Sequence, residues 1–248
     1  MKRLHIFLVV INVFLSTFLV AQKPINVGNH AYAVYLLKGE KNILIDAGLP
    51  GMDGEIEQNL KKNNVQPSEI SFIILTHGHY DHVGCAASFK QKYGTQIIVG
   101  EGDETKCTTG KTGNYRITSP QKWLVKQVLK HGKIPTMFEP TTTLKKFEIL
   151  DLAEYGINAN VKVMGGHTDG SLVVMAHDKS WCLVGDLLRG SVVPLFHWMP
   201  KIHFFAENPS ENWRIIRTLL DEGYQKFYPA HFGPITAKRV RKKFYAMR

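Results

Sequence analysis

The sequence predicts an α/β fold, a sandwich of two sheets flanked by helices. Short runs of β-branched and aromatic residues recur along the chain, as expected for strands. Helical patterns separate only some of these runs, so the strict strand–helix alternation of a single parallel sheet is missing. With 248 residues and 44% hydrophobic residues, the chain is long enough for one compact domain. No Pro-rich or Gly/Ser-rich linker divides it.

The first half of the chain predicts four strands and two helices. In the first helix, Ile56 and Leu60 lie four positions apart and therefore share one face. The segment 101–118, rich in Gly and Thr, predicts an irregular loop. The predicted strands are 31–37, 41–46, 71–75 and 96–99, and the predicted helices are 53–63 and 81–93.

The second half predicts a helix at 121–131 and then a series of strands. Asn208 is expected to cap the following helix, with Pro209 in its first turn and Glu211 reaching back to the cap. Gly223 is expected to end that helix. A basic helix closes the chain. The predicted strands are 144–150, 160–164, 171–177, 180–185 and 225–229.

Residues 1–21 have the order of a secretory signal peptide. Lys2 and Arg3 precede an apolar run from Ile6 to Val20, and a small residue and a polar stretch follow. The run is shorter than the ~20 apolar residues that span a bilayer comfortably. The alternative is that the segment stays attached as an uncleaved anchor. Both outcomes predict an exported protein, periplasmic or secreted, whose folded domain is 22–248.

The net charge of +10 does not by itself indicate nucleic-acid binding. Two positive charges lie in residues 1–3 and six in the tail 238–248, and neither segment holds an acid, so the body is close to neutral. No aromatic–basic motif for reading nucleic acid accompanies them. The tail predicts a solvated helix face with a weak attraction to anionic surfaces. Membrane contact is therefore expected only through an uncleaved N-terminus or this basic helix.

The cysteines do not form a disulfide framework. Cys85, Cys107 and Cys182 lie far apart, and an odd number leaves at least one unpaired. Buried free thiols are the expected state, because free cysteine is among the most buried residue types. A bridge from Cys182 to either of the others stays open at this point.

The stretch ILTHGHYDHVG, residues 73–83, concentrates side chains that bind metals. His77, His79, Asp81 and His82 lie within six positions at the end of an apolar strand. The first two are two apart in an extended segment and point the same way, whereas the last two begin a helix. Burying four such groups without a common partner is costly. The motif therefore predicts a metal-binding loop.

Three further residues of this kind stand at predicted strand ends beside Gly or Pro. They are His167 in MGGHTDGS, Asp186 in CLVGDLL and His231 in YPAHFGP. Each alone is more often structural than functional. Together with the first loop they make five histidines and two aspartates, which is enough to hold two metal ions.

With H-x-H-x-D-H and these three residues in this order, the chain resembles the metallo-β-lactamase-fold hydrolase superfamily over residues 25–235. The resemblance implies a four-layer αβ/βα sandwich with the site at one edge, between the sheets. Asp46 in LIDAG corresponds to an aspartate near the family's site that orients a ligand. The implied ligands are His77, His79 and His167 for one ion and Asp81, His82 and His231 for the other, with Asp186 bridging.

The chemistry follows from the ligand types. Nitrogen and carboxylate ligands without thiolate favour two zinc ions, and iron and manganese accept the same donors. A metal-bound water loses its proton near neutral pH and becomes a nucleophilic hydroxide. Asp81 is the candidate catalytic residue, because its carboxylate can accept a proton while it binds a metal. The sequence offers no competing Ser–His–Asp or Cys–His arrangement, and 100–113 lacks P-loop spacing.

Departures from subfamily patterns narrow the expected reaction. The zinc β-lactamases that the chain resembles carry cysteine or serine in place of Asp186, so aspartate favours other substrates. Lactonases of the family place a tyrosine shortly after this aspartate, where Leu187, Leu188 and Arg189 stand here. The expected function is an exported binuclear hydrolase that attacks a carbonyl ester, lactone or thioester through a metal-bridging hydroxide. A zinc β-lactamase is the alternative, followed by a metal-stabilised binding protein without turnover.

Two segments are expected to form the rim of the site. One is PLFHWMPKIHFF at 194–205, and the other is the loop 101–118. Arg189 or Lys201 is expected to receive a substrate carboxylate. Nothing in 101–160 is basic enough for the nucleic-acid arm of the family's nucleases, so the expected partner is a small-molecule substrate and no nucleic acid.

Overall fold

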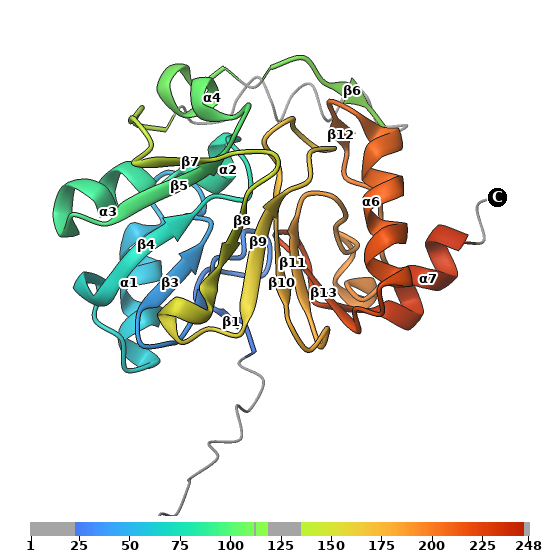
Figure 1. The fold of residues 1–248 in the computed structure, drawn as a ribbon, viewed down its shortest axis with the longest axis horizontal. Coiled ribbons are helices and arrows are strands. Elements are labelled where there is room, and N and C mark those ends of the chain that lie inside the picture. The colour runs from blue at the N-terminus through green and yellow to red at the C-terminus, as the bar shows by residue number, and fades with distance from the viewer. Residues whose placement is uncertain (1–22, 112, 119–134, 246–248) are drawn as a thin grey trace, which may run out of the picture.

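Figure 1 shows the computed structural model, which describes residues 23–111, 113–118 and 135–245. Two six-stranded sheets face each other in the middle of the molecule, and helices cover their outer faces (Figure 1). These four layers are the αβ/βα sandwich implied by the resemblance, and that prediction is confirmed. The predicted helix 121–131 and the N-terminal segment 1–21 lie outside the described residues.

The first sheet has the order β1–β2–β3–β4–β5–β7. Its last four strands run parallel, and β1 and β2 pair antiparallel at one edge. The strands are β1 (Ile25–Asn26), β2 (Tyr35–Leu37), β3 (Asn42–Ile45), β4 (Ile70–Ile74), β5 (Gln96–Gly100) and β7 (Thr142–Leu144). The helices of this half are α1 (Asp53–Lys62), α2 (Tyr80–Val83), α3 (Ala86–Tyr93) and α4 (Glu104–Thr109), with a 3₁₀ turn at Pro67–Glu69.

The second sheet has the order β14–β13–β11–β10–β9–β8. Its strands are β8 (Ile149–Asp151), β9 (Ala159–Val163), β10 (Leu172–Ala176), β11 (Cys182–Gly185), β13 (Lys226–Pro229) and β14 (Ile235–Thr236). The helices α6 (Pro209–Asp221) and α7 (Ala237–Tyr245) cover it, and 3₁₀ turns lie at Leu152–Tyr155 and Pro194–Phe196. A separate two-stranded ribbon joins β6 (Arg116–Ile117) to β12 (Phe205–Ala206).

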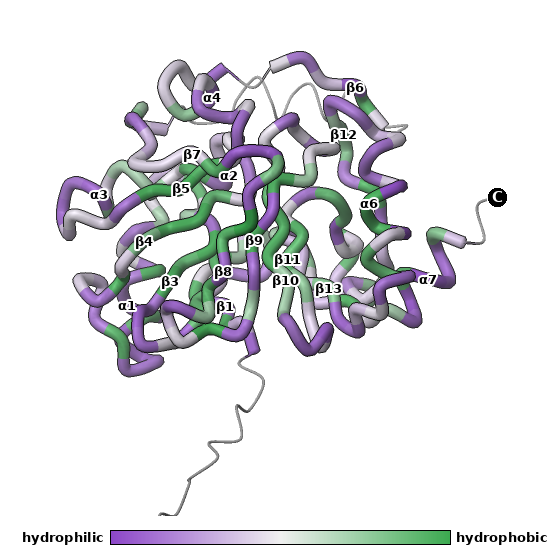
Figure 2. Tube along the Cα trace, viewed as in Figure 1, coloured by the Kyte–Doolittle hydropathy of each residue, from purple (hydrophilic) through white to green (hydrophobic). Residues whose placement is uncertain are grey.

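Successive residues of the inner strands belong to different apolar layers. Leu36 and Leu44 pack toward α1 and α3, whereas Leu37, Ile43 and Ile45 pack between the two sheets. A third layer lies between the second sheet and helices α6 and α7. Because both faces are covered, these strands are apolar throughout, and Figure 2 shows them as a hydrophobic centre within a hydrophilic surface.

Several predicted elements are shorter or interrupted. The strand predicted at 31–37 is only Tyr35–Leu37, because the Asn29 side chain accepts hydrogen bonds from the backbone of Ala31 and Tyr32 and turns the chain. The strand predicted at 144–150 is divided into β7 and β8 by a turn. The segment 101–118, predicted to be irregular, contains α4 and β6.

The helix predicted at 81–93 is two helices, α2 and α3. The chain between them passes close to another segment: a Cβ on Gly84 would lie 2.3 Å from the carbonyl oxygen of Gly48. Asn208 caps α6 as predicted, through a hydrogen bond from the Glu211 amide at 3.3 Å. The Glu211 side chain pairs with Arg214 instead of reaching back to the cap, which corrects that prediction.

Two further observations concern the state of the cysteines and the length of the helices. Cys85, Cys107 and Cys182 are buried free thiols, and no disulfide joins them in the described structure. None of the helices within 23–111, 113–118 and 135–245 has the length and hydropathy needed to cross a membrane.

Candidate metal centre

The site lies where the carboxyl ends of strands from both sheets meet. In the first sheet, β3 and β4 run parallel; in the second, β9, β11 and β13 share one direction. Residues that directly follow such strands therefore gather at one edge of each sheet. The predicted residues are Asp46 after β3, His77, His79, Asp81 and His82 after β4, His167 after β9, Asp186 after β11 and His231 after β13.

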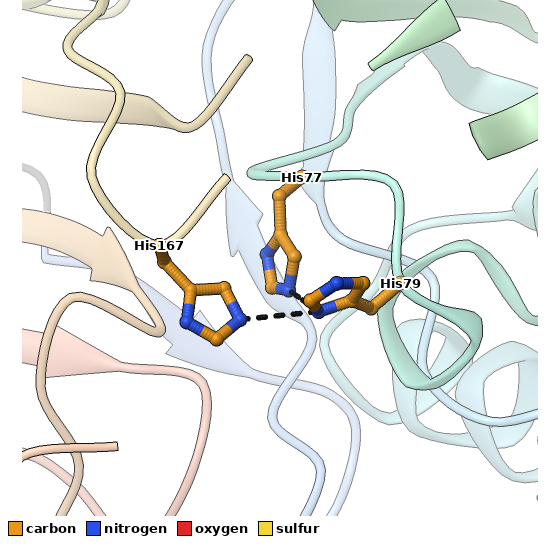
Figure 3. Close-up of side chains that lie close together, drawn as sticks. All are labelled: His77, His79 and His167. Carbon is orange, nitrogen blue, oxygen red and sulfur yellow. Dashed lines mark hydrogen bonds between the residues drawn. The ribbon is translucent and has the colours of Figure 1, made fainter. Parts of the chain in front are cut away.

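Three histidines form the first cluster. His77 Nε2 lies 3.0 Å from His79 Nδ1, and His167 Nε2 lies 3.1 Å from the same atom, as Figure 3 shows. All three side chains are buried, at 2% exposure or less. A tetrahedral zinc ion with ~2.0–2.1 Å bonds would hold its nitrogen ligands about 3.3 Å apart. The three rings therefore converge with a spacing close to that of a metal site.

Two carboxylates and two histidines form the second cluster. His231 Nε2 lies 3.4 Å from Asp81 Oδ2 and 3.3 Å from Asp186 Oδ1, and His82 Nε2 lies 3.5 Å from Asp186 Oδ2. Asp186 Oδ2 also lies 3.8 Å from His77 Nε2 and 3.6 Å from the ring of His167 in the first cluster. Asp186 thus stands between the two clusters.

Buried polar atoms without partners test whether these residues fit a metal pair. His82 Nε2, His231 Nε2 and Asp186 Oδ1 are buried and have no hydrogen-bond partner among the described residues. Such atoms are costly unless something shared satisfies them. A cation between them would do so, because each offers a lone pair toward the same space. The residues present therefore fit divalent ions.

The far sides of three rings are held by neighbours, as ligating histidines require. His77 Nδ1 lies 3.2 Å from Thr76 Oγ1, and His82 Nδ1 lies 2.9 Å from Asp46 Oδ2. The His231 Nδ1 atom contacts the carbonyl oxygen of Ala31. Each contact fixes the orientation of its ring and leaves Nε2 facing the site.

Asp46 is the centre of one of these supports. Its carboxylate accepts hydrogen bonds from the Thr76 amide at 2.7 Å and from Thr76 Oγ1 at 2.9 Å, besides that from His82. It adopts φ 66°, in the left-handed region that few non-glycine residues enter. Gly185, just before Asp186, packs so close that a Cβ there would lie 2.7 Å from Thr76 Oγ1. These contacts pack the loops that follow β3 and β4 against the end of β11, beside the site.

Charge balance within the site shifts several pKa values. Burial lowers the pKa of His79, and it lowers those of His77 and His167 well below the usual value. At His82 burial has the same effect, but the nearby carboxylates outweigh it and raise the pKa to about 10. Burial raises the pKa of Asp81, but the facing histidines outweigh it and hold the pKa at about 2. The carboxylates are therefore ionised at neutral pH.

A buried ion pair that the sequence did not reveal braces two of the loops. Asp103 accepts hydrogen bonds from the Gly78 amide and from Thr168 Oγ1, both at 2.7 Å. Lys106 Nζ donates to Asp103 at 2.7 Å and lies 3.2 Å from Glu207. Gly78 separates His77 from His79, and Thr168 follows His167. One aspartate thus ties both loops of the first cluster.

A pocket of about 230 Å³ opens beside the second cluster. Its lining residues are Ala31, Tyr32, His79, Tyr80, Asp81, Val192, His203, Phe204, Phe205, His231 and Phe232. The end of the segment 194–205 thus forms part of the rim, as predicted, whereas 101–118 contributes no lining residue. The Arg189 guanidinium stacks on Phe204 at 3.7 Å and donates to the Gly190 carbonyl. Neither Arg189 nor Lys201 is among the described lining residues, and a substrate contact by either stays a prediction.

His203 is a residue of the site that the sequence did not single out. It lies at 5% exposure on the pocket wall, and its Nε2 is 3.0 Å from Asp186 Oδ2. Burial lowers its pKa to about 4. Its only sequence signal is its place in the aromatic segment 194–205, which also contains His197. His197 instead contacts His30, and its ring centroid lies 5.5 Å from that of Phe232.

Two curated relatives match parts of the chain. The hydroxyacylglutathione hydrolase GloC of Haemophilus influenzae is 30% identical over 152 residues, which are 60% of this chain and 62% of that protein. The exodeoxyribonuclease WalJ of Streptococcus pneumoniae is 27% identical over 159 residues, which are 64% of this chain and 51% of that protein. Each match covers less than two thirds of the relative's length.

Two further comparisons concern the fold and the family of the chain. The metallo-beta-lactamase GOB-18 of Elizabethkingia meningoseptica superposes with a TM-score of 0.63 at 19% identity, covering 92% of this chain and 86% of that one. At this identity the likeness concerns the fold alone. Residues 27–231 match the profile described as the Metallo-beta-lactamase superfamily. Because this match runs through every predicted ligand to His231, the chain belongs to the metallo-beta-lactamase superfamily.

Proposed function

We propose that the protein is an exported metal-dependent hydrolase that holds two divalent ions and cleaves a small carbonyl ester, lactone or thioester. The observation that carries this proposal is the convergence of five histidines and two aspartates, several with orphaned buried atoms, beside a small pocket. Membership of a superfamily whose matched relatives are named as hydrolases and a nuclease supports it.

The proposed ligands divide as the two clusters do. His77, His79 and His167 hold the first ion, Asp81, His82 and His231 hold the second, and Asp186 reaches both. The donor set contains nitrogen and carboxylate oxygen without thiolate, which favours zinc, while iron and manganese accept the same donors. When bound, such ions supply a nucleophilic water at neutral pH and stabilise negative charge on a carbonyl oxygen.

The chain's own residues position the reactants. Asp186 directs Oδ2 toward His167 and His82 and Oδ1 toward His231, so its carboxylate lies between the two ligand sets. Asp81 lines the pocket and is the proposed proton acceptor, since its ionised carboxylate faces both the site and the space for substrate. Burial of the three-histidine cluster excludes bulk water from that side.

The pocket favours an uncharged, partly apolar substrate. Tyr32, Phe204, Phe205 and Phe232 line it, and no lysine or arginine is among its lining residues. The name of the relative GloC, a hydroxyacylglutathione hydrolase, supports an acyl substrate. A β-lactam is the second candidate, because it is also a carbonyl compound and the fold is shared with GOB-18.

A small substrate is proposed rather than a polymer. The pocket of about 230 Å³ is smaller than the ~300–1,000 Å³ of typical ligand sites. Helix α7 packs on α6, and none of its basic residues is among the described residues that line the pocket. Because the relative WalJ is named as an exodeoxyribonuclease, DNA must be included among the substrates tested.

The test is a substrate panel applied to the metal-loaded protein and to His79→Ala. The panel contains chromogenic esters, lactones, thioesters, phosphodiesters, a cephalosporin and single-stranded DNA. Turnover of an ester, lactone or thioester that His79→Ala abolishes, while circular dichroism shows a retained fold, supports the proposal. Preferred hydrolysis of the cephalosporin or of DNA contradicts the proposed substrate. Ligand binding without turnover anywhere in the panel points to a binding protein.

Export is proposed from the first residues alone. Lys2 and Arg3 before the apolar run Ile6–Val20 are the features that support it. Expression of the full chain in a bacterial host, followed by mass spectrometry of the periplasmic fraction, should find a protein that begins near Gln22. A cytoplasmic, full-length product would contradict the proposal.

A further inference from the structure

His203 stands among the proposed ligands without belonging to either cluster. Its ring lies edge-on to that of His167, with centroids 4.7 Å apart, and stacks on that of His231 at 5.6 Å. It is the third residue from the end of the segment 194–205, two residues before strand β12 begins. Two rings from the second sheet therefore flank it, and its remaining side faces the pocket.

Both ring nitrogens of His203 face hydrogen-bond acceptors. Nδ1 lies 3.3 Å from the carbonyl oxygen of Phe205, and Nε2 lies 3.0 Å from Asp186 Oδ2. Burial lowers the pKa of His203 to about 4, so the neutral ring carries one proton for these two acceptors. With that proton on Nδ1, Nε2 presents a lone pair beside the carboxylate, an arrangement that a shared cation would stabilise.

The cation that both atoms could share is the first of the proposed pair. The ligand atoms of His167, Asp186 and His203 all lie within 4.8 Å of one another. Asp186 Oδ2, the oxygen nearest to His203, faces His77 and His167 of the first cluster and also His82 of the second. The grouping with His167, whose ring centroid lies 4.7 Å from that of His203, places His203 beside the three-histidine cluster.

We propose that His203 Nε2 is an additional metal ligand, which binds the ion held by His77, His79 and His167. This inference rests on the proposed metal pair and adds a residue that the superfamily resemblance did not supply. It gives that ion five protein ligands, counting Asp186. Zinc reaches five-coordination in catalytic sites, and five protein ligands would fill it, so water and substrate would be taken up by the second ion. Because His203 also lines the pocket, it would contact the space that substrate enters.

Direct bonds between metal and nitrogen provide the test. The protein is labelled with ¹⁵N-histidine and loaded with ¹¹³Cd²⁺, which is spin-active and takes zinc's ligands. Nitrogen spectra should show one-bond cadmium coupling to an Nε2 that disappears in His203→Ala and persists in His197→Ala. His197 is the matched control, because it lies on the same segment and contacts His30 instead of the site.

A second measurement uses zinc itself. Competition with a chromophoric chelator should show the zinc affinity of His203→Ala reduced by more than the roughly 10–100-fold that the loss of a supporting residue costs, because a ligand itself is removed. His197→Ala should bind zinc as the wild type does.

The outcomes separate this inference from the one on which it rests. Wild-type protein saturated with cadmium, showing coupling to other histidines but none at His203, would overturn the inference and leave the metal pair intact. Failure of the wild type to bind cadmium or zinc at all would overturn both. The wild-type coupling needs no variant, so the test stands even where His203→Ala folds poorly.

Discussion

The carboxylate of Asp46 accepts a hydrogen bond from Nδ1 of His82 at 2.9 Å, on the side of the ring away from the site. Nε2 of His82 thereby faces Asp186 at 3.5 Å and is the atom that can bind a metal once its proton leaves. By contacting the far side of the His82 ring, Asp46 fixes both the orientation and the tautomer of this proposed ligand. Hydrogen bonds of this kind hold several of the proposed ligands in place, and they can be removed by mutation while every ligand is kept.

Asp46→Asn should weaken binding of the second zinc ion by roughly 10–100-fold. Asparagine has the same shape and tolerates the φ of 66° at this position. Its amide, however, brings donor hydrogens into a place where His82 and Thr76 already donate. Chelator competition measures the effect. Asp53→Asn, at a surface ion pair with Lys92, is the control and should bind zinc normally.

Lys106→Met should destabilise the fold by about 3–5 kcal/mol, because it leaves the buried Asp103 charge without its partner. Urea denaturation of the metal-free protein measures this. Lys92→Met is the control: that lysine is half-exposed and pairs with Asp53 and Glu57 at the surface. Its loss should cost less than ~1 kcal/mol. Equal effects of the two substitutions would refute a bracing role for Lys106.

The Lys106 contribution should also depend on pH. Burial lowers its pKa, but Asp103 and Glu207 outweigh burial, and the pKa in the folded state is raised above the ordinary 10.5. A raised pKa means that the stabilisation is complete below pH 10.5 and declines as the pH rises through the folded-state value. The difference in stability between wild type and Lys106→Met should therefore be constant at neutral pH and shrink in strongly alkaline solution. A difference that stayed constant there would contradict the ion pair.

Zinc binding to the metal-free protein should release about two protons per chain at pH 8. The carboxylates outweigh burial at His82 and at His231 and raise the pKa of both, so both rings carry a proton there before the metal arrives. Calorimetry in two buffers of different ionisation enthalpy counts the protons. Titrations with the same heat in both buffers would show that the rings are neutral beforehand.

Gly84→Ala should cost about 1–3 kcal/mol, as overpacking does. A Cβ there would lie 2.3 Å from backbone atoms of residues 48–50, and backbone cannot move aside as a side chain can. Gly54→Ala is the matched control in helix α1, where a Cβ meets nothing within 4 Å. That change should leave stability equal or raise it by about 0.4–1 kcal/mol. Chemical denaturation of the two variants compares them.

The elements that carry the site were predictable because strand ends and ligand types coincide in the sequence. Each of His77, His167, Asp186 and His231 follows an apolar strand closely, and the structure places all four strands with that end at the site. The divided helix at Gly84 was not predictable, since the reason is a backbone contact with residues 48–50.

The supporting residues were hidden for a related reason. In the sequence, Lys106 is a lysine among threonines and acids, and nothing there shows that it pairs with Asp103 and with the distant Glu207. His203 and His197 occupy one aromatic segment, and nothing in that segment distinguishes them. Long-range packing decides that one ring enters the site and the other meets His30.

The ligands come in nearly equal shares from the two sheets, and each sheet has its own apolar layer with its own helices. A bound ion would therefore link two halves that are otherwise joined by the apolar layer between the sheets. Saturation at 1,000 times the dissociation constant would add about 4.1 kcal/mol against separation of the two halves. Starved of metal, the protein should open more often and be cut sooner by proteases, so its lifetime, as well as its turnover of substrate, should follow the supply of metal.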